Sequence, residues 1–243
     1  MELSLFEACR KKRLTLVYAI TAFAIALLSA AVCTPIQIWA YSNILVSETV
    51  FLILWDGVVT AVGYAFYWVS FAFVLYFLSR FTAKSCKSVL GVYLGASAFL
   101  YLASLLSSCL VNGFEDFVLN DLLDVLMYVG LDAAQMAIVF LIGWKLVNGR
   151  DSLPIPSLLQ WKNPMARSAF LASSVSALIH IASRIRYDIF YGIPTDTADL
   201  LWMISAYVSE LVALIVGYLL IVLLLNLLEA KEAERRKNYS ESI

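Results

Sequence analysis

"DLLWMISAYVSELVALIVGYLLIVLLLNLL", residues 199–228, is the stretch of sequence that most clearly indicates the fold. A helix of about 20 consecutive apolar residues crosses the hydrocarbon core of a bilayer. That core offers no water to backbone N–H and C=O groups, so a single crossing segment of this kind has to be helical. The stretch therefore predicts a transmembrane helix, and it carries two acids, Asp199 and Glu210.

Five more segments share this length and apolar character. Of the 243 residues, 62% are hydrophobic and 14% are charged, and the mean hydropathy is +0.85. Soluble domains are closer to half apolar and a quarter charged. The five prolines fall in connecting loops or at helix ends, where a missing N–H is tolerated. We therefore predict an all-α membrane protein with residues 1–243 in one domain and six transmembrane helices, near 14–34, 50–78, 88–111, 121–147, 168–190 and 199–228.

Lysines and arginines indicate how the chain is threaded. All but two of the 17 precede the first helix, follow the last one, or lie in or beside the second and fourth connections. The positive-inside rule assigns that side to the cytoplasm. We expect both termini in the cytoplasm and the protein in the plasma membrane, with three helical hairpins and a tail, at 14–78, 88–147, 168–228 and 229–243. The two exceptions are Arg184 and Arg186.

The second helices of the three hairpins align without gaps. An acid near the outer end recurs in each, and a polar residue follows it eleven positions later. These positions are Asp56, Asp121 and Asp199, followed by Tyr67, Asp132 and Glu210. The pattern is compatible with a threefold internal repeat, as in transporters built from repeats. It is also compatible with three ordinary hairpins whose acids coincide.

Two of these acids are predicted deep inside the membrane. Eleven residues of helix span roughly 16 Å at about 1.5 Å per residue. Asp132 and Glu210 therefore lie near the middle of a hydrocarbon core about 30 Å thick. The outer acids, by contrast, form a polar layer at or near the interface: Asp56, Asp121, Asp124, Asp188 and Asp199.

The fifth helix carries the only histidine of the chain. His180, Arg184 and Asp188 recur every four residues and so form one stripe. A charge facing lipid at mid-span costs about 2.5–3.5 kcal/mol on insertion scales, so the stripe should face the other helices. We compare the depths of these residues in the membrane by counting from the outer end of each helix. Arg184 lies near the depth of the outer acids and is expected to pair with Asp199, Asp121 or Asp188. His180 lies near the depth of Glu210 and Asp132 and is expected to pair with one of them.

The sequence supports two functional hypotheses. Ionisable groups inside a membrane usually mark a substrate or ion route. We therefore predict a transporter or channel-like protein for a small solute or ion, with Asp132, Glu210, His180 and Arg184 along its pathway. The alternative is a scaffold or regulatory subunit in which these groups form a structural core. Besides the lipid bilayer, a protein partner is then expected at the 148–166 loop or the C-terminal tail.

Other classes of function find little support. A lone histidine and the absence of a phosphate-binding glycine loop argue against an enzyme, a metal site or a cofactor. No broad basic surface suggests nucleic acid. Cys33 and Cys109 fall at predicted outer helix ends, where a disulfide is conceivable, but small apolar helix residues explain them as well. The aromatic stretch at 63–77 is typical of core or lipid-facing material, with ligand stacking as the alternative.

Overall fold

The computed structural model describes residues 2–43, 49–81, 83–113, 119–148, 160–192 and 197–241, and these residues form helices joined by turns. In chain order the elements are α1 (Glu2–Leu28), a π-helical turn (Ser29–Cys33), α2 (Thr34–Asn43), α3 (Thr49–Arg80), a 3-10 turn (Ala83–Ser85), α4 (Cys86–Asn112), α5 (Leu119–Val147), α6 (Pro164–Tyr191) and α7 (Thr197–Glu241). Six stretches of them are long and apolar enough to cross a membrane. The predicted all-helical fold with six long apolar helices is confirmed.

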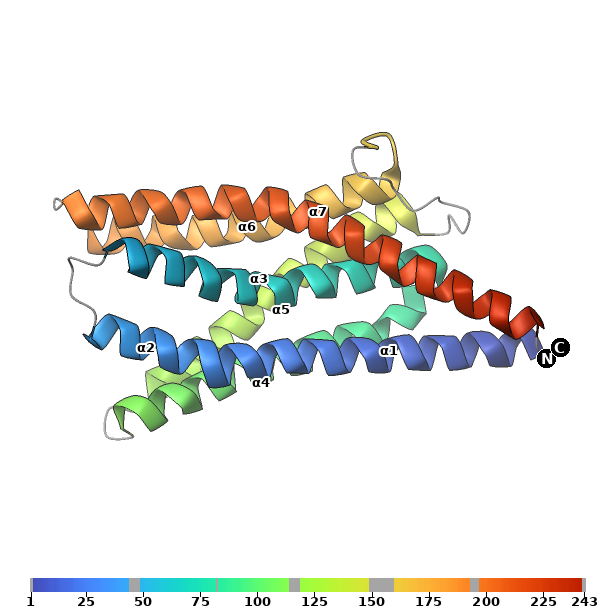
Figure 1. Ribbon diagram of the computed structural model, residues 1–243, viewed down its shortest axis with the longest axis horizontal. Helices are drawn as coiled ribbons and strands as arrows, with labels where there is room; N and C mark the ends of the chain where they lie inside the picture. Colours follow the sequence, from blue (N-terminus) through green and yellow to red (C-terminus); the bar gives the residue numbers. More distant parts are fainter. Residues whose placement is uncertain are drawn as a thin grey trace.

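One helix, α3, occupies the centre of the bundle (Figure 1). It contacts α1, α4, α5, α6 and α7, which follow one another around it as neighbours in that order. Its apolar span is 72% buried, whereas the other five spans are 28–44% buried. The three helices of the predicted repeat, α3, α5 and α7, therefore do not occupy equivalent places. The arrangement does not confirm the threefold repeat.

The aromatic stretch at 63–77 explains why α3 takes the centre. Phe66, Phe71, Tyr76 and Phe77 are almost completely buried, so most of this stretch is core material. The surrounding helices instead expose leucines and isoleucines on their outer faces, such as Leu110, Leu178 and Ile189. Large exposed apolar surfaces are uncommon on soluble monomers and suggest contact with a membrane or a partner.

The first predicted span continues further than the sequence suggested. We expected Pro35 at a helix end, but the helical backbone runs on through it to Asn43. Proline lacks the N–H for a helical bond, and its ring crowds the preceding turn. The π-helical turn at Ser29–Cys33 lies just before it, and the Thr34 N–H and hydroxyl both bond to the Ser29 carbonyl. This wider turn accommodates the proline inside a continuous helix.

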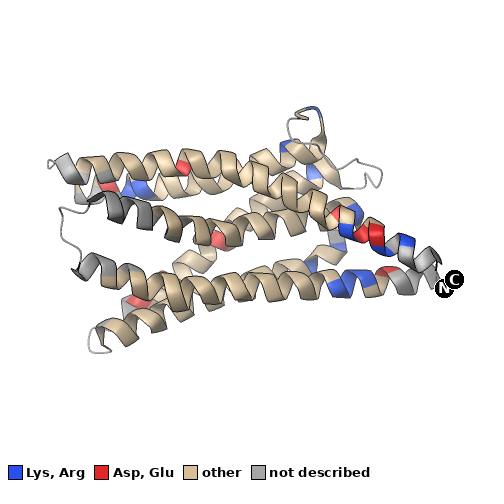
Figure 2. Ribbon diagram, in the orientation of Figure 1, with Lys and Arg blue, Asp and Glu red and all other residues tan. Residues whose placement is uncertain are grey.

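Basic residues gather at the end of the bundle where α1 begins and α7 ends (Figure 2). Lysines and arginines of the α3–α4 connection and of the start of α6 lie toward the same end. The exception is the blue segment in the second half of α6, which carries Arg184 and Arg186. This end of the bundle is called the basic end below.

Ion pairs close the basic end between α7 and the rest of the bundle. The Glu232 carboxylate is 2.9 Å from Nε of Arg10 and 2.7 Å from an Nη of Arg13, both on α1. Glu229 lies 3.1 Å from Nε of Arg80 on α3. Arg10 also donates to the Tyr76 hydroxyl at 3.0 Å. The first turns of the predicted 229–243 tail are thus part of the folded bundle.

Candidate functional site

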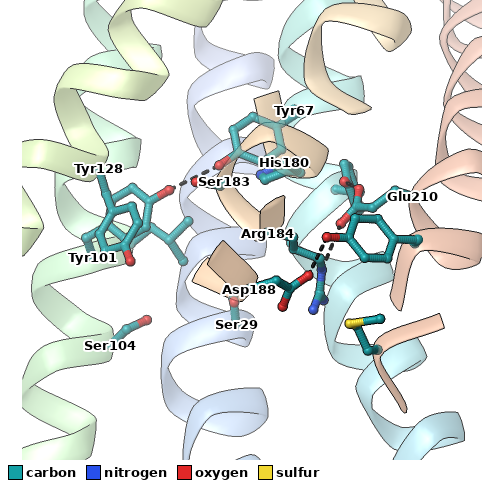
Figure 3. A pocket seen from close by; sticks show the side chains of 15 residues that line it. Ser29, Tyr67, Tyr101, Ser104, Tyr128, His180, Ser183, Arg184, Asp188 and Glu210 are labelled. Atoms are coloured by element: carbon teal, nitrogen blue, oxygen red, sulfur yellow. Dashed lines mark hydrogen bonds and ion pairs between the residues drawn. The ribbon is translucent and has the colours of Figure 1, made fainter. Parts of the chain in front are cut away.

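A cavity of about 630 Å³ lies in the half of the bundle away from the basic end. Residues of the π-helical turn and of α3, α4, α5, α6 and α7 line it. One wall carries charged side chains from α6 and α7. The facing wall carries tyrosines from α3, α4 and α5 (Figure 3).

The charged wall joins α6 to α7 and to α3. Arg184 Nε lies 3.7 Å from Oε1 of Glu210, and the Tyr64 hydroxyl donates to the other oxygen of the same carboxylate. Asp188, one turn beyond Arg184, accepts a hydrogen bond from the Tyr207 hydroxyl. Glu210 is buried, whereas the Arg184 side chain keeps 29% of its surface exposed. Three predicted site residues, His180, Arg184 and Glu210, therefore line one cavity.

Arg184 pairs with an acid that was not among its predicted partners. We expected Asp199, Asp121 or Asp188, and the structure pairs Arg184 with the deeper Glu210. The side chain of Asp199 lies outside the described residues. Side chains of an α-helix lean toward its N-terminus. The N-terminus of α6 lies at the basic end and that of α7 at the opposite end, so Arg184 and Glu210 lean toward each other. Counting Cα levels from the helix ends ignored this tilt.

His180 packs between tyrosines instead of pairing with an acid. Its ring centroid is 4.9 Å from that of Tyr64 and 5.6 Å from that of Tyr67. Its buried Nδ1 has no well-formed hydrogen bond within the described residues. The predicted pairing of His180 with Glu210 or Asp132 is therefore wrong. Tyr64 takes the place beside Glu210 that was expected for the imidazole.

Asp132 lies just behind the tyrosine wall and does not line the cavity. Its carboxylate accepts hydrogen bonds from Tyr67 at 3.0 Å and from Ser97 at 2.7 Å, and Tyr101 lies at 3.5 Å. Tyr67 and Tyr101 both line the cavity. One hydroxyl group therefore separates this buried carboxylate from the cavity.

Of the predicted outer acids whose side chains the structure describes, only Asp188 lines the cavity. Asp121 is half-buried and Asp124 is exposed, both in the first turns of α5. The side chains of Asp56 and Asp199 lie outside the described part of the structure. The outer acids with described side chains therefore do not form a continuous layer around the site.

The tyrosines are the site residues that the sequence analysis missed. Tyr64, Tyr67, Tyr101, Tyr128 and Tyr207 all line the cavity, and the Tyr101 and Tyr128 rings stack at 5.4 Å. A tyrosine hydroxyl in an apolar span needs a hydrogen-bond partner. A tyrosine at the same depth as a buried acid could therefore have been predicted as a site residue. Tyr67 is such a tyrosine, because it aligned with Asp132 and Glu210.

The described residues form neither a metal site nor a disulfide. Within the described ranges, no group of three or more His, Cys, Asp or Glu side chains could hold a metal ion. All four cysteines are free, and Cys33 and Cys109 are buried as thiols. The conceivable disulfide between them is not present.

The ion pair predicts unequal effects of the two arginines on α6. Arg184→Ala removes a partner from the buried carboxylate of Glu210, and we expect a loss of about 1–3 kcal/mol in unfolding free energy. Arg186→Ala, at an exposed position, should cost much less. Arg184→Leu together with Glu210→Leu should recover part of the loss. Thermal melting in detergent measures all of these variants, and equal effects of the two alanine substitutions would contradict the pairing.

Comparisons with protein-family models, curated proteins and solved structures found no match for this chain. Its function is therefore inferred from the geometry of the cavity.

Proposed function

We propose that this chain is an integral membrane protein that binds a small solute or ion in the cavity and carries it across the membrane. The observation that supports this is a cavity of about 630 Å³, lined by charged and aromatic side chains, among helices long and apolar enough to span a bilayer. Pockets for small molecules typically have volumes of about 300–1,000 Å³ and place a few polar groups in an apolar wall.

The open cavity favours a transport function over the alternative of a scaffold or regulatory subunit. A polar core that only fixes helix register is expected to be close-packed, as protein interiors are. Here His180, Arg184, Asp188 and Glu210 all border the cavity. At the proposed partner surface of the tail, Glu229 and Glu232 bind within the chain. Residues 149–159 of the 148–166 loop lie outside the described part.

The two ends of the bundle suggest how a solute passes. We assign the basic end to the cytoplasm by the positive-inside rule, so the cavity faces the other side. The ion pairs of Glu229 and Glu232 then close the cytoplasmic end. Moving α7 away from α1 and α3 would open that end. The closed basic end and the cavity together represent one state of an alternating-access cycle.

A cysteine pair tests whether water reaches the cavity. Gly63 on α3 lines the cavity, and Gly130 on α5 is exposed. The two glycines lie at a similar depth, because each is within about one helical turn of a member of the Tyr67–Asp132 hydrogen bond. A Cβ at either glycine meets open space, so both substitutions should fold. In a background without native cysteines, a charged methanethiosulfonate should modify Gly63→Cys at least about tenfold faster than Gly130→Cys, because thiolates form in water and not in lipid.

The purified protein in nanodiscs is the sample for this measurement, because both faces are then open to the reagent. A slow reaction at Gly63→Cys, equal to that at Gly130→Cys, would mean a dry cavity. The structural-core alternative would then replace the transport proposal.

A further inference from the structure

We propose that the solute is an organic cation with an apolar or aromatic body. This inference rests on the transport function proposed above and assigns the ligand class of the same cavity. The charged wall would hold the cationic group, and the tyrosine wall would hold the body of the molecule.

The charges around the cavity are unbalanced toward negative. Among the described residues, the carboxylates of Asp188 and Glu210 line it together with one guanidinium, of Arg184. Arg184 pairs with Glu210, whereas Asp188 accepts from a tyrosine hydroxyl. Asp132 adds a third carboxylate, which lies behind the tyrosine wall, and its described hydrogen-bond partners are hydroxyl groups. An arrangement of this kind attracts a cation and repels an anion.

His180 does not restore the balance. An imidazolium ion carries two N–H donors, and each of them needs an acceptor when it is buried. Within the part of the chain that the structure describes, the buried Nδ1 of His180 has no well-formed partner, and its ring packs against those of Tyr64 and Tyr67. This environment fits the neutral imidazole.

The tyrosine rings provide a surface for the same cation. Cations bind the faces of aromatic rings, and the attraction grows when water is excluded. Tyr64, Tyr67 and Tyr207 each donate their hydroxyl to a carboxylate, which makes their rings richer in electrons. Tyr101 and Tyr128 stack on each other at the facing wall. A volume of about 630 Å³ suits an organic molecule better than a single ion.

Two probes of the same shape and opposite charge test this assignment. Tetraphenylphosphonium should bind the detergent-solubilised full chain saturably, and tetraphenylborate should not. Asp188→Asn keeps the acceptor for Tyr207 but removes the charge, so it should weaken phosphonium binding roughly tenfold. Tyr128→Leu removes an aromatic face and should weaken binding several-fold.

Glu234→Gln is the control, because it removes one charge at an exposed site on the basic end. It should leave phosphonium binding unchanged. If Asp188→Asn does not fold, Tyr128→Leu and the contrast between the two probes still decide. Binding of both probes alike, tighter binding of the borate, or phosphonium binding that neither variant weakens would overturn the assignment. Such a result with rapid labelling of Gly63→Cys rejects only the ligand class, whereas a protected Gly63→Cys rejects the transport function itself.

Discussion

Glu232→Ala is expected to lower the free energy of unfolding by about 3–5 kcal/mol, the usual cost of removing one partner from a buried ion pair. Glu232 is 2% exposed and Arg10 is 6% exposed, and their side chains are 2.9 Å apart. The alanine variant leaves the Arg10 guanidinium buried with the Tyr76 hydroxyl and the Phe81 ring beside it. Titration of the detergent-solubilised protein with sodium dodecyl sulfate measures the loss.

Two further variants separate this ion pair from a general effect of charge. Glu234→Ala changes an exposed acid two residues away on α7 and should cost less than about 0.5 kcal/mol. Arg10→Leu combined with Glu232→Leu should recover a large part of the loss, because no charge is then left buried. Similar effects of Glu232→Ala and Glu234→Ala would show that α7 is not held to α1 by these charges.

Gly217→Ala is the second substitution with a large expected effect. A Cβ at this position of α7 would lie 2.2 Å from Nε1 of Trp68 on α3 and 2.5 Å from Oγ of Ser173 on α6. Three helices meet here, and small residues allow such close approach between helices in a membrane. We expect a loss of about 1–3 kcal/mol, because the indole has to move. Trp68 stacks on Tyr64, so this movement would also disturb Glu210.

Gly130→Ala is the matched control for that substitution. A Cβ there has no heavy atom within 4 Å, so alanine should raise helix stability by up to about 1 kcal/mol. Melting temperatures in detergent compare the two variants directly. A Gly217→Ala protein at least as stable as Gly130→Ala would contradict the close packing of α3, α6 and α7.

The sequence predicted the helices well because apolar length alone determines a span. The predicted helix 121–147 matches α5 (Leu119–Val147), and the start of the predicted 199–228 helix lies within two residues of the start of α7. The error at Pro35 arose because a proline was taken as a helix end, while the π-helical turn that accommodates it has no simple sequence signature. The central place of α3 follows from its aromatic residues, but periodicity alone could not show it.

The site was predicted in its residues more than in its pairs. Helical spacing placed His180 level with Glu210 and placed Arg184 nearer the outer acids, and all three line one cavity. Which of them touch depends on side-chain direction and on the rotation of each helix, and neither can be obtained from spacing. The acids were visible because charges are rare in apolar segments. Tyr64 and Tyr207 were not, because tyrosines are common there and only their partners mark them.

The sidedness of cysteine labelling in intact cells tests the outward-facing cavity most directly. A membrane-impermeant methanethiosulfonate is applied from outside to Gly63→Cys, which lines the cavity, and to Lys84→Cys, which is exposed at the basic end. Gly63→Cys should react in intact cells, and Lys84→Cys should react only after the cells are permeabilised. Labelling of Lys84→Cys from outside, or protection of Gly63→Cys in intact cells, would contradict an outward-facing cavity closed by the basic end.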